Sequence, residues 1–155
     1  MVTRTSFVAL LMIALISAVS SPAAEKRVSR SQLPQPVRNT ADEQSKGATV
    51  REYTTEVENG QREYEVEMIF EGHSKDVTIA QDGRLLEIEE QASINELPAQ
   101  VISALHRKAG PGEITKVESI TKNGTIVAYE AQVRTAGKHS EIQVGPNGRD
   151  LKHEQ

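Results

Sequence analysis

The chain has 155 residues and a net charge of −4, and it contains no cysteine and no tryptophan. The lack of cysteine excludes disulfide bonds, thiol chemistry and thiolate zinc sites. The acidic balance excludes a typical nucleic-acid-binding surface, which needs basic groups to neutralise phosphates. Aromatic residues make up only 3% of the chain, so we expect a core built mainly from aliphatic side chains.

Residues 1–23 have the organisation of a secretory signal peptide. Arg4 precedes an apolar run from Phe7 to Val19, and Ser21-Pro22-Ala23 places small residues before a cleavage site. The apolar run is shorter than a bilayer span. The alternative is an uncleaved helix that anchors the chain at a membrane. We expect an exported protein, periplasmic or secreted, that makes no membrane contact after cleavage.

Residues 24–32 are polar and carry three basic side chains. Such a segment has too little apolar surface to fold alone, so we expect a disordered leader. The folded part is predicted to begin at residue 33.

The first part of the folded region has the pattern of one helix followed by antiparallel strands. Pro34 suits a first helical turn, and Gly47 suits the end of a helix that runs to about Ser45. Asn59-Gly60 is a strong hairpin signal because both turn residues need a positive φ. Apolar and polar residues alternate on either side of it, as in a half-buried strand. The predicted strands are Thr49–Glu58, Glu63–Phe70, a third around Val77 and Ile79, and a short fourth around Leu86 and Ile88.

The second part repeats this organisation. Leu97, Val101 and Leu105 are spaced four apart, which predicts an amphipathic helix, and Gly110-Pro111-Gly112 predicts its end. The predicted strands that follow are Ile114–Thr121, Ile126–Thr135 and Glu141–Val144.

The two parts are related by a nearly constant offset. Leu97-Pro98 follows Leu33-Pro34 by 64 residues, and Tyr129-Glu130 follows Tyr64-Glu65 by 65. A fixed period through helix, turns and strands predicts two tandem repeats, over residues 33–90 and 91–155. The predicted fold is α+β, with repeats of the form α-β-β-β(-β) and an antiparallel sheet carrying both helices on one face.

The order of these motifs resembles the PepSY-like family, and more narrowly its β-lactamase-inhibitor-like group. The resemblance rests on Leu33-Pro34 and Val37, Tyr64-Glu65-Val66 and Asp82-Gly83, and on their counterparts Leu97-Pro98, Val101, Tyr129-Glu130-Ala131 and Asn147-Gly148. It implies an antiparallel sheet with helices on one face. It also implies a non-enzymatic role in protein binding or peptidase inhibition. The matching positions are structural, so the resemblance assigns no contact residue.

The acidic residues of the first repeat are the most distinctive predicted surface. Glu63, Glu65 and Glu67 alternate along one strand, and Glu52 and Glu56 are expected beside them on the neighbouring strand. These five glutamates form our predicted binding site for a cationic partner, because complementary charge steers association. The alternative is an ordinary solvated sheet face. The second repeat has a more mixed set, Glu130, Gln132 and Arg134.

The sequence shows no catalytic, phosphate-binding or cofactor motif, so we predict no enzymatic activity, no cofactor and no metal site. His73 and His139 fall in corresponding loops, where the alternatives are a weak metal site and plain surface residues. The first hypothesis for function is therefore an exported binding module that recognises another exported or envelope protein, through protein interaction or peptidase inhibition. The alternative is an envelope accessory protein that binds a small ligand or cation.

Overall fold

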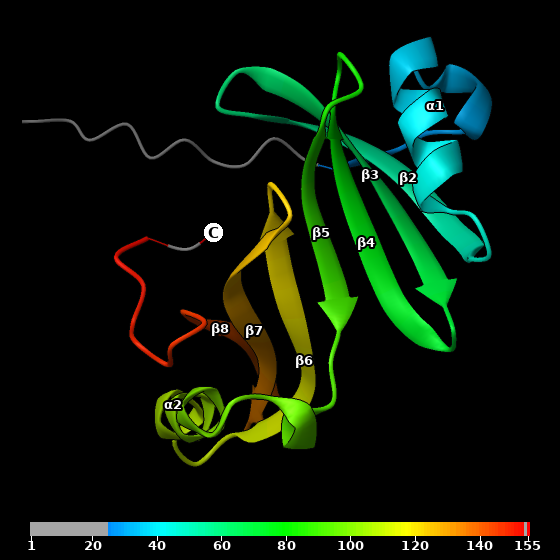
Figure 1. The fold of residues 1–155 in the computed structure, drawn as a ribbon. Coiled ribbons are helices and arrows are strands. Elements are labelled where there is room, and N and C mark those ends of the chain that lie inside the picture. The colour runs from blue at the N-terminus through cyan, green and yellow to red at the C-terminus, as the bar shows by residue number, and fades with distance from the viewer. Residues whose placement is uncertain (1–24, 154) are drawn as a thin grey trace, which may run out of the picture.

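The computed structural model describes residues 25–153 and 155. Eight strands form one sheet in which every neighbouring pair is antiparallel, and their order in the sheet is their order in the chain (Figure 1). The strands are β1 (Lys26–Arg27), β2 (Thr49–Glu58), β3 (Gln61–Phe70), β4 (His73–Ala80), β5 (Leu85–Gln91), β6 (Glu113–Lys122), β7 (Thr125–Thr135) and β8 (Lys138–Val144).

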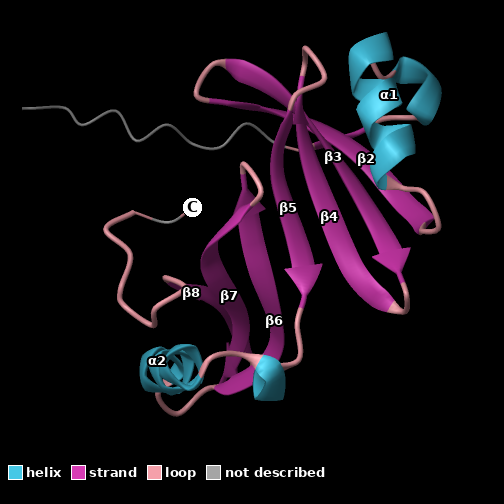
Figure 2. Ribbon diagram, in the orientation of Figure 1, coloured by secondary structure: helices cyan, strands magenta, loops and turns pink. Residues whose placement is uncertain are grey.

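Two α-helices and two short 3₁₀-helices interrupt the strands (Figure 2). The 3₁₀-helix η1 (Arg30–Gln32) precedes α1 (Gln35–Gln44), and η2 (Ile94–Glu96) precedes α2 (Ala99–Ala109). The α+β class and the predicted helices are therefore confirmed. None of the helices in the described ranges is long and apolar enough to cross a membrane.

The predicted disordered leader is wrong for the residues that the structure describes. Lys26 and Arg27 form β1, which pairs with Thr54 and Thr55 of β2. The Val28 N–H then donates to the Tyr53 carbonyl oxygen at 2.9 Å. This segment is ordered because the outer edge of β2 offers it backbone hydrogen-bond partners. The predicted signal peptide, residues 1–23, lies outside the described residues.

The order of elements occurs twice, as strand, 3₁₀-helix, α-helix and three strands. The pairing of Lys26 with Thr55 corresponds to that of Glu90 with Ser119, since both positions are shifted by 64 residues. By this correspondence β5 occupies the place that β1 occupies in the first half. The predicted boundary after residue 90 falls inside β5, because a two-residue strand gave no pattern from which the unit's start could be recognised.

Both helices lie on the same face of the sheet. On that face Val66 of β3 is opposite Val77 of β4, which is opposite Ile88 of β5, and the register continues to Thr121 of β6. Side chains two residues apart share a face, so Val117 of β6 also lies on this side.

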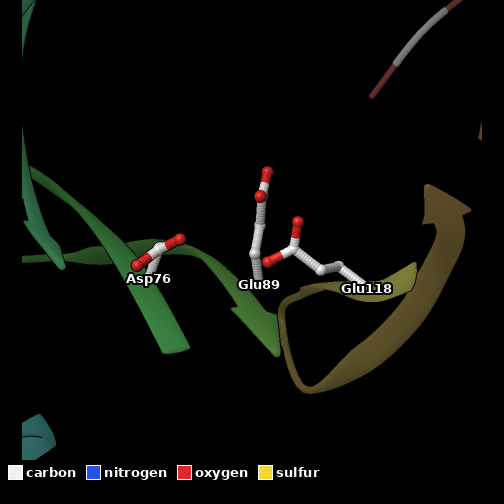
Figure 3. Close-up of side chains that lie close together, drawn as sticks. All are labelled: Asp76, Glu89 and Glu118. Carbon is white, nitrogen blue, oxygen red and sulfur yellow. The ribbon is translucent and has the colours of Figure 1, made fainter. Parts of the chain in front are cut away.

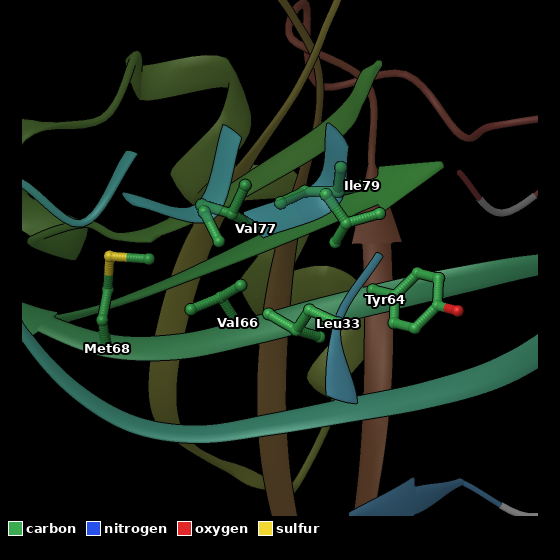
Figure 4. Close-up of a cluster of buried hydrophobic side chains, with 8 residues drawn as sticks. Leu33, Tyr64, Val66, Met68, Val77 and Ile79 are labelled. Atoms are coloured by element: carbon green, nitrogen blue, oxygen red, sulfur yellow. The ribbon is translucent and has the colours of Figure 1, made fainter. Parts of the chain in front are cut away.

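The helix face is covered by two separate clusters of buried side chains. The first joins Leu33 and α1 to β3 and β4, with Val66, Val77 and Ile79 fully buried (Figure 4). The second joins α2 to β6, β7 and β8, and includes the fully buried Leu105. Neither helix of the described residues lies on the opposite face of the sheet, and the candidate site lies there.

Candidate functional site: the acidic face of the sheet

The face of the sheet opposite the helices carries carboxylates on seven successive strands, and we call it the acidic face. Alternation explains its origin, because most strands turn their apolar side chains to the helices and their polar ones away. The exceptions on β6 and β7 are Ile120 and Ala128, which are buried on this face. The register of the strand pairs places the carboxylates of neighbouring strands on this same face. The acidic face comprises Glu52, Glu56, Glu58, Glu63, Glu65, Glu67, Asp76, Glu87, Glu89, Glu113, Glu118, Glu130 and Glu141.

The five predicted site residues all lie on the acidic face. Glu52 is directly opposite Glu67, and Glu56 is directly opposite Glu63, with Glu65 between them on β3. The prediction that the two β2 glutamates lie beside the three β3 glutamates is therefore confirmed. Like charges directly opposite one another destabilise a sheet by some tenths of a kcal/mol. Binding by these residues stays a prediction.

The acidic face is hollowed into a cleft of about 520 Å³ between the tips of three hairpins. Its carboxylate lining includes Glu56, Glu63, Glu65 and Glu89, and its cationic residues are Arg84 and Lys122. Both cations are already paired, Arg84 with Asp82 at 2.9 Å and Lys122 with Glu87 at 2.8 Å. The cleft therefore presents an excess of negative charge.

Partial burial changes the protonation of this lining. Burial, with smaller effects from Asp76 and other neighbouring carboxylates, raises the pKa of Glu65 to about 7. Burial and then the charges of Glu58 and Glu56 raise the pKa of Glu63. Both shifts have the sign expected when a carboxylate loses water without gaining a cation.

Three further carboxyl groups approach one another where β4, β5 and β6 lie side by side. One oxygen from each of Asp76, Glu89 and Glu118 lies within 4.8 Å of the others (Figure 3). We call these three residues the seam cluster. Glu118 is only 3% exposed. The Lys116 ammonium lies 2.6 Å from the Glu118 carboxylate, and the Ser74 hydroxyl donates to the same carboxylate at 3.3 Å.

Two members of the seam cluster, Asp76 and Glu89, retain protons more strongly than ordinary carboxyl groups. Burial is the main cause of the raised pKa of Glu89, and a hydrogen bond and charge repulsion from Glu87 add to it. Burial also raises the pKa of Asp76 to about 6, against an opposing effect from Lys116. Chemically, such a group can share a proton or offer oxygen ligands to a hard cation.

Sequence reasoning missed the seam cluster. Alternation around Val77 and Ile79 places Asp76 on the polar face, and the same holds for Glu89 beside Ile88. The pairing of β5 with β6, which brings Glu118 to them, has no local signal because η2 and α2 separate these strands.

The structure does not bring His73 and His139 together. His73 begins β4 and His139 lies on β8, with three strands between them in the sheet. The alternative of a shared histidine metal site is therefore wrong.

The second half of the acidic face is more neutral than the first, as the sequence predicts. The Gln143 side-chain amide donates to Glu130 at 2.8 Å, and Gln143 in turn accepts a hydrogen bond from the Gln155 N–H. Arg134 pairs with Glu113 at 2.7 Å.

Comparison with solved structures identifies the fold. A BLIP-like protein from Bacteroides fragilis is 20% identical, with a TM-score of 0.54 over 78% of this chain and 84% of its own. The fold is BLIP-like. A DUF2874 family protein from Bacteroides ovatus is 17% identical, with a TM-score of 0.60 over 77% and 84% of the two chains.

A third similar structure is that of a candidate periplasmic protein from Bacteroides eggerthii. It is 16% identical, with a TM-score of 0.62 over 77% of this chain and 86% of its own. No family model and no curated protein matches the sequence. At these identities the likeness establishes the BLIP-like fold, while the narrower PepSY-like resemblance stays a prediction.

Proposed function

We propose that this protein is an exported, non-enzymatic binding module that docks a cationic segment of another exported or envelope protein on its acidic face. The observation that carries the proposal is the cleft between the hairpin tips, where carboxylates outnumber cations and the nearby cations are already paired. A lysine or arginine side chain entering this cleft would meet several carboxylates at once. Charge-assisted hydrogen bonds of that kind are about twice as strong as neutral ones.

The fold supports the same reading. The sheet face that carries none of the described helices is broad enough for a protein surface, and the chain shares its fold with a BLIP-like protein. The signal-peptide pattern and the candidate periplasmic protein of the same fold support export. Peptidase inhibition is one form that such binding takes, and it predicts a slow-dissociating complex with a peptidase and no turnover of the chain.

The correspondence between the two halves supports a tandem origin from a PepSY-like unit. Two observations support this origin. The order of elements is the same in both halves, and the β1–β2 pairing has the same register as the β5–β6 pairing. On this view the unit was duplicated, and the first copy kept or gained the more acidic face.

Capture from an envelope extract with the mature chain as bait tests the proposal. The test variant carries Glu63→Lys, Glu65→Lys and Glu67→Lys. The matched control carries Glu43→Lys, Glu71→Lys and Glu96→Lys, which reverse three exposed glutamates outside the acidic face. We expect the native chain and the control variant to capture a basic protein, and the test variant to capture none of it.

Direct binding of the captured protein then supplies the decisive measurement. Its affinity should weaken as ionic strength rises, because salt screens exposed charges. The proposal would be contradicted if the test variant still captured the protein, or if the affinity did not change with salt concentration.

A second candidate function is favoured by the same cleft. Its volume and carboxylate lining suit a small organic cation or a metal ion as well as a protein side chain. An envelope accessory protein of this kind should melt at a higher temperature when its ligand is added, through mass action on the native state. A polyamine and Ca²⁺ are the probes to use, and stabilisation by either without any captured protein would favour this candidate.

A further inference from the structure

The pairing between β5 and β6 is the shortest among the six strands that follow β2. It runs only over Ile88–Gln91 and Glu118–Thr121, whereas β3 and β4 pair from Glu63–Ala80 to Phe70–His73. Unlike these two strands, β5 and β6 are not joined by a tight turn, since η2 and α2 lie between them. We call this pairing the seam.

The seam also lies between the two buried clusters. One core packs on α1 and the other on α2, and among the described residues none belongs to both cores. The seam is therefore held by its own backbone ladder, by the buried Ile120 side chain of β6 and by a few polar contacts. Those contacts include Lys122 with Glu87 at 2.8 Å and the Ala92 N–H donating to the Val117 carbonyl oxygen at 2.9 Å.

The seam cluster lies across this short pairing. Asp76 comes from β4, Glu89 from β5 and Glu118 from β6, and their carboxyl groups converge within 4.8 Å (Figure 3). The Ser74 hydroxyl of β4 reaches Glu118 across β5. Attraction within this group stabilises the strand pairing, and repulsion within it acts against the pairing.

The charges around the seam cluster are mostly negative. Glu65 and Glu67 face it from β3, Glu87 from β5 and Glu130 from β7. Among the residues that the structure describes, Lys116 is the cation that contacts the cluster, through Glu118. One ammonium does not balance three carboxylates, so a retained proton removes the largest repulsion.

We propose that the seam cluster is a proton-dependent clasp: a proton shared by Asp76, Glu89 and Glu118 keeps β6 paired with β5, and its loss loosens the seam. Loosening relieves repulsion by moving β6 and the strands beyond it away from β5. The sheet would then flex as two halves, and the shape of the acidic face would depend on external pH. This proposal does not depend on the identity of any partner.

Amide hydrogen exchange of the full mature chain tests the clasp. Protection of Ile88–Gln91 and Glu118–Thr121 is measured at pH 6 and pH 9, corrected for intrinsic exchange and divided by the protection of the β2–β3 amides. In the native chain, we expect the protection of the seam amides relative to the β2–β3 amides to be about tenfold or more lower at pH 9 than at pH 6. A tenfold change corresponds to a shift of one pKa unit. The β2–β3 reference separates local opening from global unfolding.

Two variants keep the test decisive. Glu89→Gln and Asp76→Asn each remove one ionisable group at nearly constant shape, so the ratio should change little with pH in either. Glu141→Gln is the matched control, since Glu141 is an exposed glutamate of the same face on β8, and it should behave as the native chain does. An unchanged ratio in the native chain, or a fall that persists in both seam variants, would overturn the proposal.

Discussion

Gly83 lies directly against the backbone of Pro36, so that a Cβ atom at residue 83 would stand 2.8 Å from the Pro36 carbonyl oxygen. The turn after β4 therefore packs on the first turn of α1 without room for a side chain. Gly148 makes the equivalent approach to Gln100 in the second half. The Asp82-Gly83 and Asn147-Gly148 motifs thus mark the places where a turn touches a helix.

Gly83→Ala should lower the free energy of unfolding by about 2–4 kcal/mol, because it adds a steric clash to the cost of a positive φ. Gly83 has φ +89°. Urea unfolding gives the measurement. Gly60→Ala is the control, since Gly60 has φ +79° but open space around it, and it should lose only about 1 kcal/mol. Equal losses in both would show that the close approach has no energetic weight.

Leu105→Ala should be among the most destabilising single truncations in the second core. The side chain is fully buried between α2 and the sheet, and such truncations cost about 2–5 kcal/mol. Thermal unfolding with calorimetry measures the change. The same truncation at Leu85, which is 37% exposed, should cost less than about 1 kcal/mol. A small loss at Leu105 would indicate that α2 contributes little to stability.

Lys116→Met should destabilise the protein at neutral pH, because it leaves the buried Glu118 carboxylate without its ammonium partner. Since the Lys116 side chain is 25% exposed, we expect a loss of about 1–3 kcal/mol, less than for a fully buried pair. Adding Glu118→Met should recover most of that loss in urea unfolding. Failure of the double variant to recover would mean that Glu118 is held chiefly by other contacts.

Stability should fall as the pH rises from about 5 to 8. The folded-state pKa values of Glu65, about 7, and Asp76, about 6, lie above the ordinary values of 4.5 and 3.8. The folded state therefore binds more protons than the unfolded state across this window, and the stabilisation is lost as pH rises through the folded-state pKa.

The pKa values of Asp42 and Asp82 are lowered in the folded state, so these two groups change the stability only at pH values below this window. Melting temperatures measured from pH 5 to 8 check the expectation, and Glu65→Gln should reduce the slope. A melting temperature that rises with pH over this range would contradict it.

The sequence was informative wherever a local pattern sufficed. Asn59-Gly60 does form a tight turn, with φ of 49° and 79°, and the alternation of Tyr64, Val66 and Met68 placed them correctly in the core. The same alternation put Glu63 and its neighbours on the opposite face.

What the sequence could not supply was the meeting of distant segments. β1 has two basic residues and no apolar alternation, so only the free edge of β2 explains why it is a strand. The seam cluster depends on the register between β5 and β6, which packing decides and no turn residue specifies. Candidate residues of one strand were therefore predictable, and a site assembled from three strands was not.

The order of the strands also has a consequence for how the chain folds. Because sheet order equals chain order, β2 to β5 and β6 to β8 can each form from successive hairpins, whose closure costs little loop entropy. Among the eight described strands, only the β1–β2 and β5–β6 pairings need the chain to return across a helix. Such dominance of local pairing favours rapid folding for a β-rich protein, with two preformed hairpin arrays joining last at the seam.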